Sequence, residues 1–267
     1  MSADPGPGIL ERLTGVPFLI MLDIDGTLAP TAPRPELAAV PVDTRRALAA
    51  LARQPGVSVC LVSGRPASEA RRMISVVPIW VIGNHGAELI DPNGQTEIDS
   101  RVAPWAGLVA QAARRLECTV AAVPGALLED KQWTLSVHYR AVDPAAVPAL
   151  RAAVTDTALG LGLVVRDGKR VIEVRPPVPV NKGTAVLDLA ERLGALASGA
   201  SLLCAGDDDT DEDAFRALRA RVPRAVTMHV GDGEGPTRTA AEILIDDPWE
   251  MSAFLIWLAA ARAEVAA

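Results

Sequence analysis

The sequence predicts an α/β protein in which a doubly wound, Rossmann-like parallel sheet forms a core that is interrupted by an inserted α+β domain. Three observations lead to this prediction. Short apolar runs alternate with helix-like segments near the start of the chain, the same rhythm returns near its end, and a stretch of different texture lies between. Parallel strands need helical crossovers, and they read as continuous apolar runs when both faces of the sheet are covered. The two outer stretches are therefore expected to build one sheet.

The elements of the core follow from this rhythm. In the first outer stretch we expect strands at residues 18–22, 57–62 and 79–82, with helices at residues 44–53 and 68–74. In the second we expect helices at residues 184–193 and 211–221, strands at 202–205, 225–230 and 242–245, and a closing helix from Pro248.

The middle stretch, residues 104–177, is expected to form the inserted domain and to leave residues 1–103 and 178–267 as the core. A segment of this size is too long for a structureless loop in a compact protein. Its pattern predicts helices at 105–117 and 145–158, and strands at 126–129, 134–139, 163–166 and 171–175 that pair as hairpins. The proline-rich exit at residues 175–180 is a stiff connector of the kind that ends domains.

Composition narrows the class of protein. Of the 267 residues, 49% are hydrophobic and 22% charged, which indicates a globule with a sizeable core. The net charge of −7 repels phosphate backbones and anionic lipid, so neither nucleic acid nor a membrane is expected as a partner. No apolar stretch reaches the length of a membrane span. Three widely separated cysteines, Cys60, Cys118 and Cys204, indicate buried thiols in the cytoplasm, and a monomer is compatible with the sequence.

The first candidate site residues are two carboxylates at the end of the first predicted strand. Asp23 and Asp25, in the run Asp23-Ile-Asp-Gly-Thr27, are two residues apart and project to the same side of the strand. They therefore point into the crevice where open α/β sheets bind ligands. Like charges this close repel each other unless a cation or a proton lies between them.

Two further polar residues follow the same logic. Ser63 comes directly after the second strand, where a hydroxyl and free backbone N–H groups suit a phosphoryl oxygen. Lys182 opens the helix that follows the insert, a position that the helix dipole disfavours for a cation. We expect a compensating negative charge beside it, such as a bound phosphate.

An acidic run follows the strand at residues 202–205, with six acids among the seven residues 207–213. Helix capping and the helix dipole account for some of these acids, as caps and first-turn acids of the next helix. We expect Glu212 and Asp213 to be helix-face acids only. A strand beside the first one would bring the rest close to Asp23 and Asp25. Hard oxygen ligands of this kind favour Mg²⁺.

Together the Asp-x-Asp-Gly-Thr run, the strand-end serine, the helix-opening lysine and the Gly-Asp-x-x-x-Asp run resemble the haloacid dehalogenase superfamily of phosphotransferases. The resemblance implies that Asp23 is the nucleophile that forms an aspartyl-phosphate and that Asp25 is the general acid and then the base. It implies that Ser63 and Lys182 hold the phosphoryl group. It also implies a Mg²⁺ cofactor held by Asp23, the backbone carbonyl of Asp25 and Asp207, with Asp211 behind them.

The insert resembles the α+β caps of the sugar-phosphate branch of this superfamily, and its finer motifs are similar to those of trehalose-6-phosphate phosphatases. These motifs are Gly-Asn-His-Gly-Ala-Glu at 83–88, Leu-Glu-Asp-Lys at 128–131, Ser-Val-His-Tyr-Arg at 136–140 and the run at 168–176. The resemblance implies Mg²⁺-dependent hydrolysis of trehalose 6-phosphate, a small-molecule sugar phosphate. The substrate-binding set expected on this basis is Arg65, Asn84, His85, Glu129, Lys131, Lys169 and Glu173.

Other interpretations stay open at this point. The enzyme could act on another sugar phosphate, such as sucrose phosphate or mannosylglycerate phosphate, or be a phosphohexomutase, because these relatives share the core and the cap type. A non-catalytic sugar-phosphate sensor is disfavoured, since Asp23, Asp25 and Lys182 are all present. Within the cap, Glu129 and Lys131 are also compatible with a surface ion pair, and His138 with packing on a cap helix.

Overall fold

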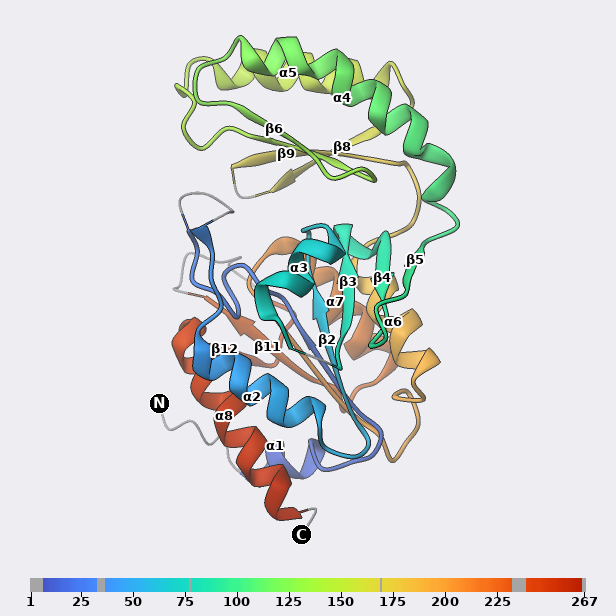
Figure 1. Ribbon diagram of the computed structural model, residues 1–267, viewed down its shortest axis with the longest axis vertical. Coiled ribbons are helices and arrows are strands. Elements are labelled where there is room, and N and C mark those ends of the chain that lie inside the picture. The colour runs from blue at the N-terminus through green and yellow to red at the C-terminus, as the bar shows by residue number, and fades with distance from the viewer. Residues whose placement is uncertain (1–6, 33–36, 77, 169, 232–238, 266–267) are drawn as a thin grey trace. The chain divides into compact units, whose positions relative to one another are not determined.

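The computed structural model describes residues 7–32, 37–76, 78–168, 170–231 and 239–265. The chain forms two compact units, a core made of Met1–Glu97 with Val180–Ala267 and a second unit made of Ile98–Pro179 (Figure 1). The second unit begins earlier than the predicted insert because residues 98–102 form the turn that leads into its first short helix, η3 (Ala103–Trp105). We call this second unit the cap.

The core is built on one eight-stranded sheet whose strands come from both outer stretches of the chain. The strands lie in the order β12-β11-β10-β1-β2-β3-β4-β5. Their bounds are β1 (Phe18–Leu22), β2 (Val57–Val62), β3 (Trp80–Gly83), β4 (Glu88–Ile90), β5 (Thr96–Ile98), β10 (Ser201–Gly206), β11 (Val226–Val230) and β12 (Ile243–Ile245). The pairs from β12 to β3 are parallel, and β4 is antiparallel to β3. The predicted union of the two outer stretches in one parallel sheet is confirmed.

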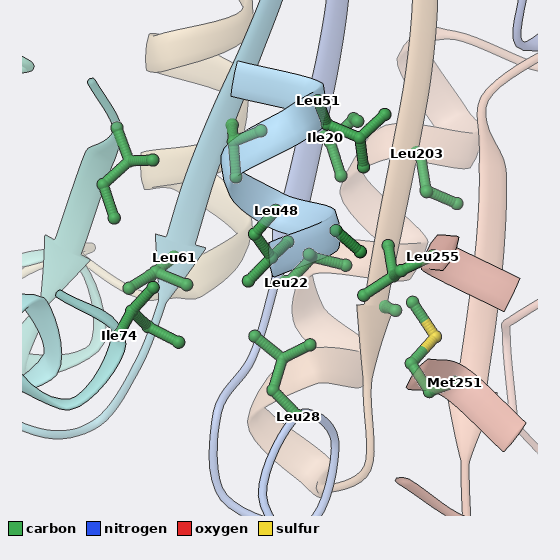
Figure 2. Close-up of a cluster of buried hydrophobic side chains, with 14 of the residues drawn as sticks. Ile20, Leu22, Leu28, Leu48, Leu51, Leu61, Ile74, Leu203, Met251 and Leu255 are labelled. Carbon is green, nitrogen blue, oxygen red and sulfur yellow. The ribbon is translucent and has the colours of Figure 1, made fainter. Parts of the chain in front are cut away.

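Helices cover both faces of this sheet, as the continuous apolar runs predict. On one face lie α2 (Val42–Ala52), α3 (Ala67–Ile74) and α8 (Pro248–Val265), and on the other lie α6 (Lys182–Arg192) and α7 (Asp209–Arg221). Side chains alternate along β1: Phe18, Ile20 and Leu22 join the first layer, and Leu19 and Met21 join the second. Figure 2 shows part of the first layer, where Leu48 and Leu51 of α2 meet Ile20 and Leu22.

A short helix near the start of the chain, α1 (Pro7–Arg12), is attached to the core by Arg12. The guanidinium of Arg12 donates to both carboxylate oxygens of Glu242, at 2.6 and 2.8 Å, and to the backbone carbonyls of Arg224 and Ala225. The residues 7–12 carry no strong helical periodicity, so this helix was not predictable from the pattern.

The cap is a four-stranded antiparallel sheet with two helices on one face. The strand order is β6-β7-β9-β8. The bounds are α4 (Ala106–Ala121), β6 (Leu127–Asp130), β7 (Leu135–His138), α5 (Val147–Leu159), β8 (Val164–Gly168) and β9 (Val171–Arg175). The side chains that pack against α4 and α5 are Leu135, Val137, Ile172 and Val174. Figure 1 shows the two helices on one face of the cap sheet. The predicted hairpins and helices of the insert are confirmed.

The expectation of three buried thiols is wrong for one cysteine. Cys60 and Cys204 are buried in strands, but Cys118 is exposed on α4. The helix places Leu116 and Val120 against the cap core and therefore turns Cys118 toward solvent. All three are free thiols. Within the described ranges, every helix is too short or too polar to span a membrane.

Candidate active site

The candidate site lies at the point where the strand order of the core sheet reverses. From β1 the chain moves to β2 on one side, whereas β10 lies on the other side of β1 and leads to β11. Asp23 follows the last residue of β1, and Asp207 follows the last residue of β10. Ligands of open α/β sheets bind in the crevice at such a switch point, beyond the carboxyl ends of the strands.

Lys182 connects the two acidic motifs. Its side chain is 1% exposed, and its Nζ donates to Asp23 Oδ1 and to Asp211 Oδ1, each at 2.8 Å. Asp208 Oδ1 lies 3.9 Å away. The expectation that a negative charge compensates this helix-opening lysine is therefore met by carboxylates of the chain itself.

Asp207 approaches the first motif closely. Gly26 has a φ of +88°, and a Cβ at this position would come within 2.3 Å of Asp207 Oδ2, so a glycine is required for both its backbone conformation and this contact. Asp23, Asp207 and Asp211 each offer a carboxylate oxygen, and the three oxygens lie within 4.8 Å of one another. These side chains are all buried.

The electrostatics of this cluster show an excess of negative charge. Burial raises the pKa of Asp23 to about 8, with Lys182 opposing the rise and Asp207 and Asp208 adding to it. Burial also raises the pKa of Asp211 against the opposing effect of Lys182. One ammonium thus does not balance the buried carboxylates. A hard divalent cation fits both this charge deficit and the oxygen donors.

The start of α7 fixes the acidic run in place. Asp208 is the N-cap residue, and its side chain accepts from the backbone N–H groups of Thr210 and Asp211. Asp211 Oδ2 in turn accepts from the backbone N–H groups of Asp207 and Asp208, each at 3.2 Å. This reciprocal capping box leaves Asp211 Oδ1 directed at Lys182.

Glu212 is not the helix-face acid that was predicted. It is 1% exposed, accepts from the backbone N–H of Ala240 at 2.7 Å, and lies within hydrogen-bond distance of the Thr239 hydroxyl. Its carboxylate thus holds the segment that enters β12 against α7. The helical pattern marks Glu212 as a first-turn acid, and only the folded chain brings residues 239 and 240 to it.

Asp25 is held by Arg65. The guanidinium donates from Nε to Asp25 Oδ2 at 2.6 Å and from Nη2 to Asp25 Oδ1 at 2.7 Å, and it also contacts Glu69. Such a bidentate pair fixes the plane of the carboxylate. Sequence reasoning assigned Arg65 to the substrate, and the structure adds a contact with the second aspartate that the motifs did not indicate.

The loops after β2 and β3 are joined at the same sheet edge. The backbone N–H of Asn84 donates to the carbonyl of Arg65, and that of His85 to the carbonyl of Ser63. Asn84 and His85 both adopt left-handed backbone conformations, with φ of 48° and 55°. The imidazole of His85 lies over Gly64, where a Cβ would come within 2.4 Å of it. The structure therefore brings Ser63, Asn84 and His85 together.

Glu88, the last residue of the Gly-Asn-His-Gly-Ala-Glu motif, caps the N-terminus of α3. Pro66 precedes α3 and offers no side-chain cap, and Glu88 Oε2 accepts from the backbone N–H of Ala67 at 2.6 Å instead. A carboxylate at this end of the helix also suits the helix dipole. Glu88 thus supports the loop that carries Ser63.

The cap presents a polar face opposite its helices. Glu129, Ser136 and Glu173 lie in one cross-strand row, because Ser136 pairs with both glutamates. Lys131 Nζ lies 3.7 Å from Glu129 Oε2, so the two side chains form the ion pair given as the alternative to sugar binding, with Lys131 buried rather than at the surface. Lys169 lies outside the described residues. Sequence reasoning missed the partners of these carboxylates: His138 donates to Glu129, and Arg175 contacts Glu173.

A comparison with protein families gives one result that covers most of the chain. The profile of the trehalose-phosphatase family matches residues 21–246. The chain belongs to the trehalose-phosphatase family.

Curated relatives agree with this membership of the trehalose-phosphatase family. The chain is 34% identical over 249 residues to a trehalose-phosphate phosphatase of Mycolicibacterium paratuberculosis, a match that covers 92% of this chain and 63% of the relative. It is 37% identical over 254 residues to an uncharacterized glycosyl hydrolase of Mycobacterium tuberculosis, covering 94% of this chain and 19% of that protein. The chain thus spans 63% of the length of the first of these relatives and 19% of the length of the second.

Solved structures of trehalose-phosphatase relatives share the fold. A trehalose-6-phosphate phosphatase related protein superposes with a TM-score of 0.80 at 27% identity, over 92% of this chain and 99% of that chain. The C-terminal domain of the Candida albicans trehalose-6-phosphate phosphatase gives a TM-score of 0.76 at 23% identity, over 94% and 95% of the two chains. The predicted haloacid dehalogenase fold with an inserted cap is therefore confirmed.

Proposed function

We propose that this protein hydrolyses trehalose 6-phosphate to trehalose and phosphate through an aspartyl-phosphate on Asp23. The observation that carries the proposal is the buried Lys182 ammonium between Asp23 and Asp211, with Asp207 beside them, at the switch point of a trehalose-phosphatase fold. An anionic phosphate ester needs positive charge near an attacking carboxylate, and Lys182 together with a bound divalent cation would supply it.

The proposed reaction has two halves. In the first, an Asp23 oxygen bonds to phosphorus while the bond from phosphorus to the sugar oxygen breaks and Asp25 gives that oxygen a proton. In the second, Asp25 takes a proton from water as the water oxygen bonds to phosphorus, the bond to Asp23 breaks, and phosphate leaves. Arg65 fixes the plane of the Asp25 carboxylate through its two hydrogen bonds.

Mg²⁺ is the proposed cofactor, which Asp23, the backbone carbonyl of Asp25 and Asp207 would hold, with Asp211 behind them. When bound, it neutralises negative charge at the phosphoryl oxygens. The residues of the chain supply the rest: Lys182 and Ser63 hold the phosphoryl group, and Lys182 also orients Asp23. The buried position of these side chains keeps bulk water from competing for the same hydrogen bonds.

Recognition of the sugar is assigned to the polar face of the cap, with Asn84 and His85 contributing from the core. Glu129, Lys131 and Glu173 offer charged hydrogen-bonding groups that suit a ligand with many hydroxyl groups. We place the reaction in the cytoplasm, and the free state of all three cysteines supports that placement.

The decisive experiment measures phosphate release from a panel of sugar phosphates, with and without Mg²⁺. The wild type should prefer trehalose 6-phosphate and require the metal. Asp23→Asn should lose more than about 99% of turnover, because an amide is a very poor nucleophile and losing covalent catalysis costs several kcal/mol. The matched control is Asp188→Asn, an exposed aspartate of α6 that should keep wild-type activity.

The same panel separates the core mechanism from the choice of substrate. Glu129→Ala and Lys131→Ala should each lower kcat/KM for trehalose 6-phosphate by about 10- to 150-fold, since each loses a charged hydrogen bond worth about 1.5 to 3 kcal/mol. Hydrolysis of p-nitrophenyl phosphate should stay nearly unchanged. A preference of the wild type for sucrose 6-phosphate or a hexose phosphate would contradict the substrate but not the aspartyl-phosphate.

A further inference from the structure

The polar face of the cap sheet carries its charged side chains in a definite pattern. Directly paired residues of antiparallel strands project to the same face, so the row of Glu129, Ser136 and Glu173 lies opposite the layer of Val137 and Ile172 that packs on the helices. The two glutamates are separated by two strand spacings, about 10 Å. They are thus placed to bind different hydroxyl groups of one sugar.

Each of these glutamates has a basic or imidazole partner on the same face. His138 pairs with Leu127 across the strands, which makes it the diagonal neighbour of Glu129. Its Nε2 lies 2.8 Å from Glu129 Oε2. Arg175 is two residues beyond Glu173 along β9, and its Nη2 contacts Glu173 Oε2. Each glutamate of the row is thus held by a nitrogen donor on the same face, from the neighbouring strand for Glu129 and from the same strand for Glu173.

The direction of the His138 hydrogen bond follows from its chemistry. An ionised carboxylate only accepts, so the proton of the bond belongs to His138 Nε2. Both side chains are 28% exposed, and a pair with this exposure adds little to the stability of a fold. What the bond does provide is a directional contact at 2.8 Å that fixes the orientation of the Glu129 carboxylate more tightly than the 3.7 Å ion pair with Lys131 does.

We propose that His138 is a positioning residue for sugar recognition, which acts by holding the Glu129 carboxylate in the orientation that receives a sugar hydroxyl. This inference rests on the proposed function, in which the polar face of the cap binds the sugar. It assigns to the histidine of the Ser-Val-His-Tyr-Arg motif a specific task, and it distinguishes that task from direct substrate contact and from packing.

A double-mutant cycle tests the inference. Its variants are His138→Ala, Glu129→Ala and the double variant, each measured by kcat/KM on trehalose 6-phosphate and on p-nitrophenyl phosphate. His138→Ala should lower kcat/KM for the sugar phosphate by about 3- to 10-fold, the range expected for one lost hydrogen bond, and change the artificial ester less than about twofold. In the Glu129→Ala background the same substitution should have almost no further effect.

Two further variants sharpen the result. His138→Gln keeps an N–H donor and should restore most of the activity on trehalose 6-phosphate. Arg115→Ala removes an exposed side chain from α4, away from the sheet, and should leave both activities unchanged. Thermal unfolding of each variant reports whether the cap itself has been weakened.

Three outcomes overturn the inference. Losses that multiply in the double variant would mean that His138 contacts the sugar independently of Glu129. Equal losses on both esters with a lower Tm would make His138 a structural residue, and no loss in His138→Ala would remove any role. A wild type inactive on trehalose 6-phosphate would instead overturn the proposed function, and the cycle would then be run on the sugar phosphate that the panel prefers. If the wild type hydrolysed no sugar phosphate, both the proposed function and the inference about His138 would be refuted.

Discussion

Lys182→Met is the substitution that most directly tests the charge balance of the site. Methionine keeps the length of the side chain and its apolar packing but removes the ammonium, which lies 2.8 Å from an oxygen of Asp23 and 2.8 Å from one of Asp211. At an effective dielectric constant of about 20, each contact contributes about 6 kcal/mol of attraction. Burying the three charges costs several kcal/mol per ion, so the net stabilisation is much smaller than the sum of the two attractions.

The loss on substitution is larger than this net value, because both carboxylates stay buried without the ammonium that compensates their charge. Removing one member of a buried ion pair costs about 3 to 5 kcal/mol. For a protein of this size, each kcal/mol lowers Tm by about 2 to 4 °C, so Lys182→Met should melt about 6 to 20 °C below the wild type in EDTA.

The same variant has a predicted pH dependence. Burial already raises the pKa of Asp23 to about 8, although the charge of Lys182 opposes this rise. Removing Lys182 therefore raises the pKa of Asp23 further. A carboxyl group whose folded-state pKa is raised destabilises the fold progressively as pH rises from its unfolded value toward the folded one. Because Asp23 of the wild type ionises only near pH 8, the Tm deficit of Lys182→Met should therefore be larger at pH 9.5 than at pH 7.

Thermal unfolding followed by circular dichroism measures these differences. Adding Asp23→Asn should recover part of the lost stability, because it removes one of the two unpaired carboxylates. The control is Arg216→Met, whose side chain is 60% exposed and whose ion pair with Asp213 should matter by less than about 1 kcal/mol. A Lys182→Met protein that melts within about 2 °C of the wild type at pH 9.5 would refute the reasoning.

Three other predictions address the leaving group, the N-terminal helix and the thiols. Asp25→Asn should slow hydrolysis of sugar phosphates more than that of p-nitrophenyl phosphate, whose leaving group hardly needs a proton; equal losses in single-turnover measurements would end its role as the acid. Arg12→Ala should lower the free energy of unfolding by about 1 kcal/mol at neutral pH. Because the hydrogen bond from Arg12 lowers the pKa of Glu242, this loss of stability should shrink as pH falls below about 4. A loss that does not depend on pH would mean that Arg12 stabilises the fold through the backbone carbonyls of Arg224 and Ala225 instead. A thiol reagent should modify Cys118 alone in the native protein and all three cysteines after denaturation, and a second reactive thiol in the native state would contradict the burial of the other two.

Much of the core was predictable because it rests on local rules. Asp23 follows a strand that is apolar on both faces, and the acidic run after β10 was expected to contain capping acids, of which Asp208 is one. The compensation of Lys182 was predictable as a need, since a cation disfavours the first turn of a helix. That Asp23 and Asp211 are the compensating carboxylates depends on β1 and β10 being neighbours in the sheet.

The unpredicted contacts all join residues that are distant in the chain. Arg65 reaches Asp25 from the next strand, and Glu212 meets a segment that returns to α7 from 28 residues further on. In the cap, the alternation of β7 places His138 on the polar face. Only the register with β6, which no local pattern fixes, makes it the neighbour of Glu129.

The position of β10 beside β1 sets a condition on synthesis at the ribosome. All five residues of β1 are buried, and one of its two edges is completed by Ser201–Gly206. At about 5 to 20 residues per second, the roughly 180 residues between the two strands take about 10 to 40 seconds to make. During that time the nascent β1 has an open edge, which is a template for unwanted pairing. The cap, made entirely from Ile98–Pro179, is complete before this edge closes. Translation speed from β1 through the cap to β10 therefore determines how long the unfinished core is exposed to aggregation.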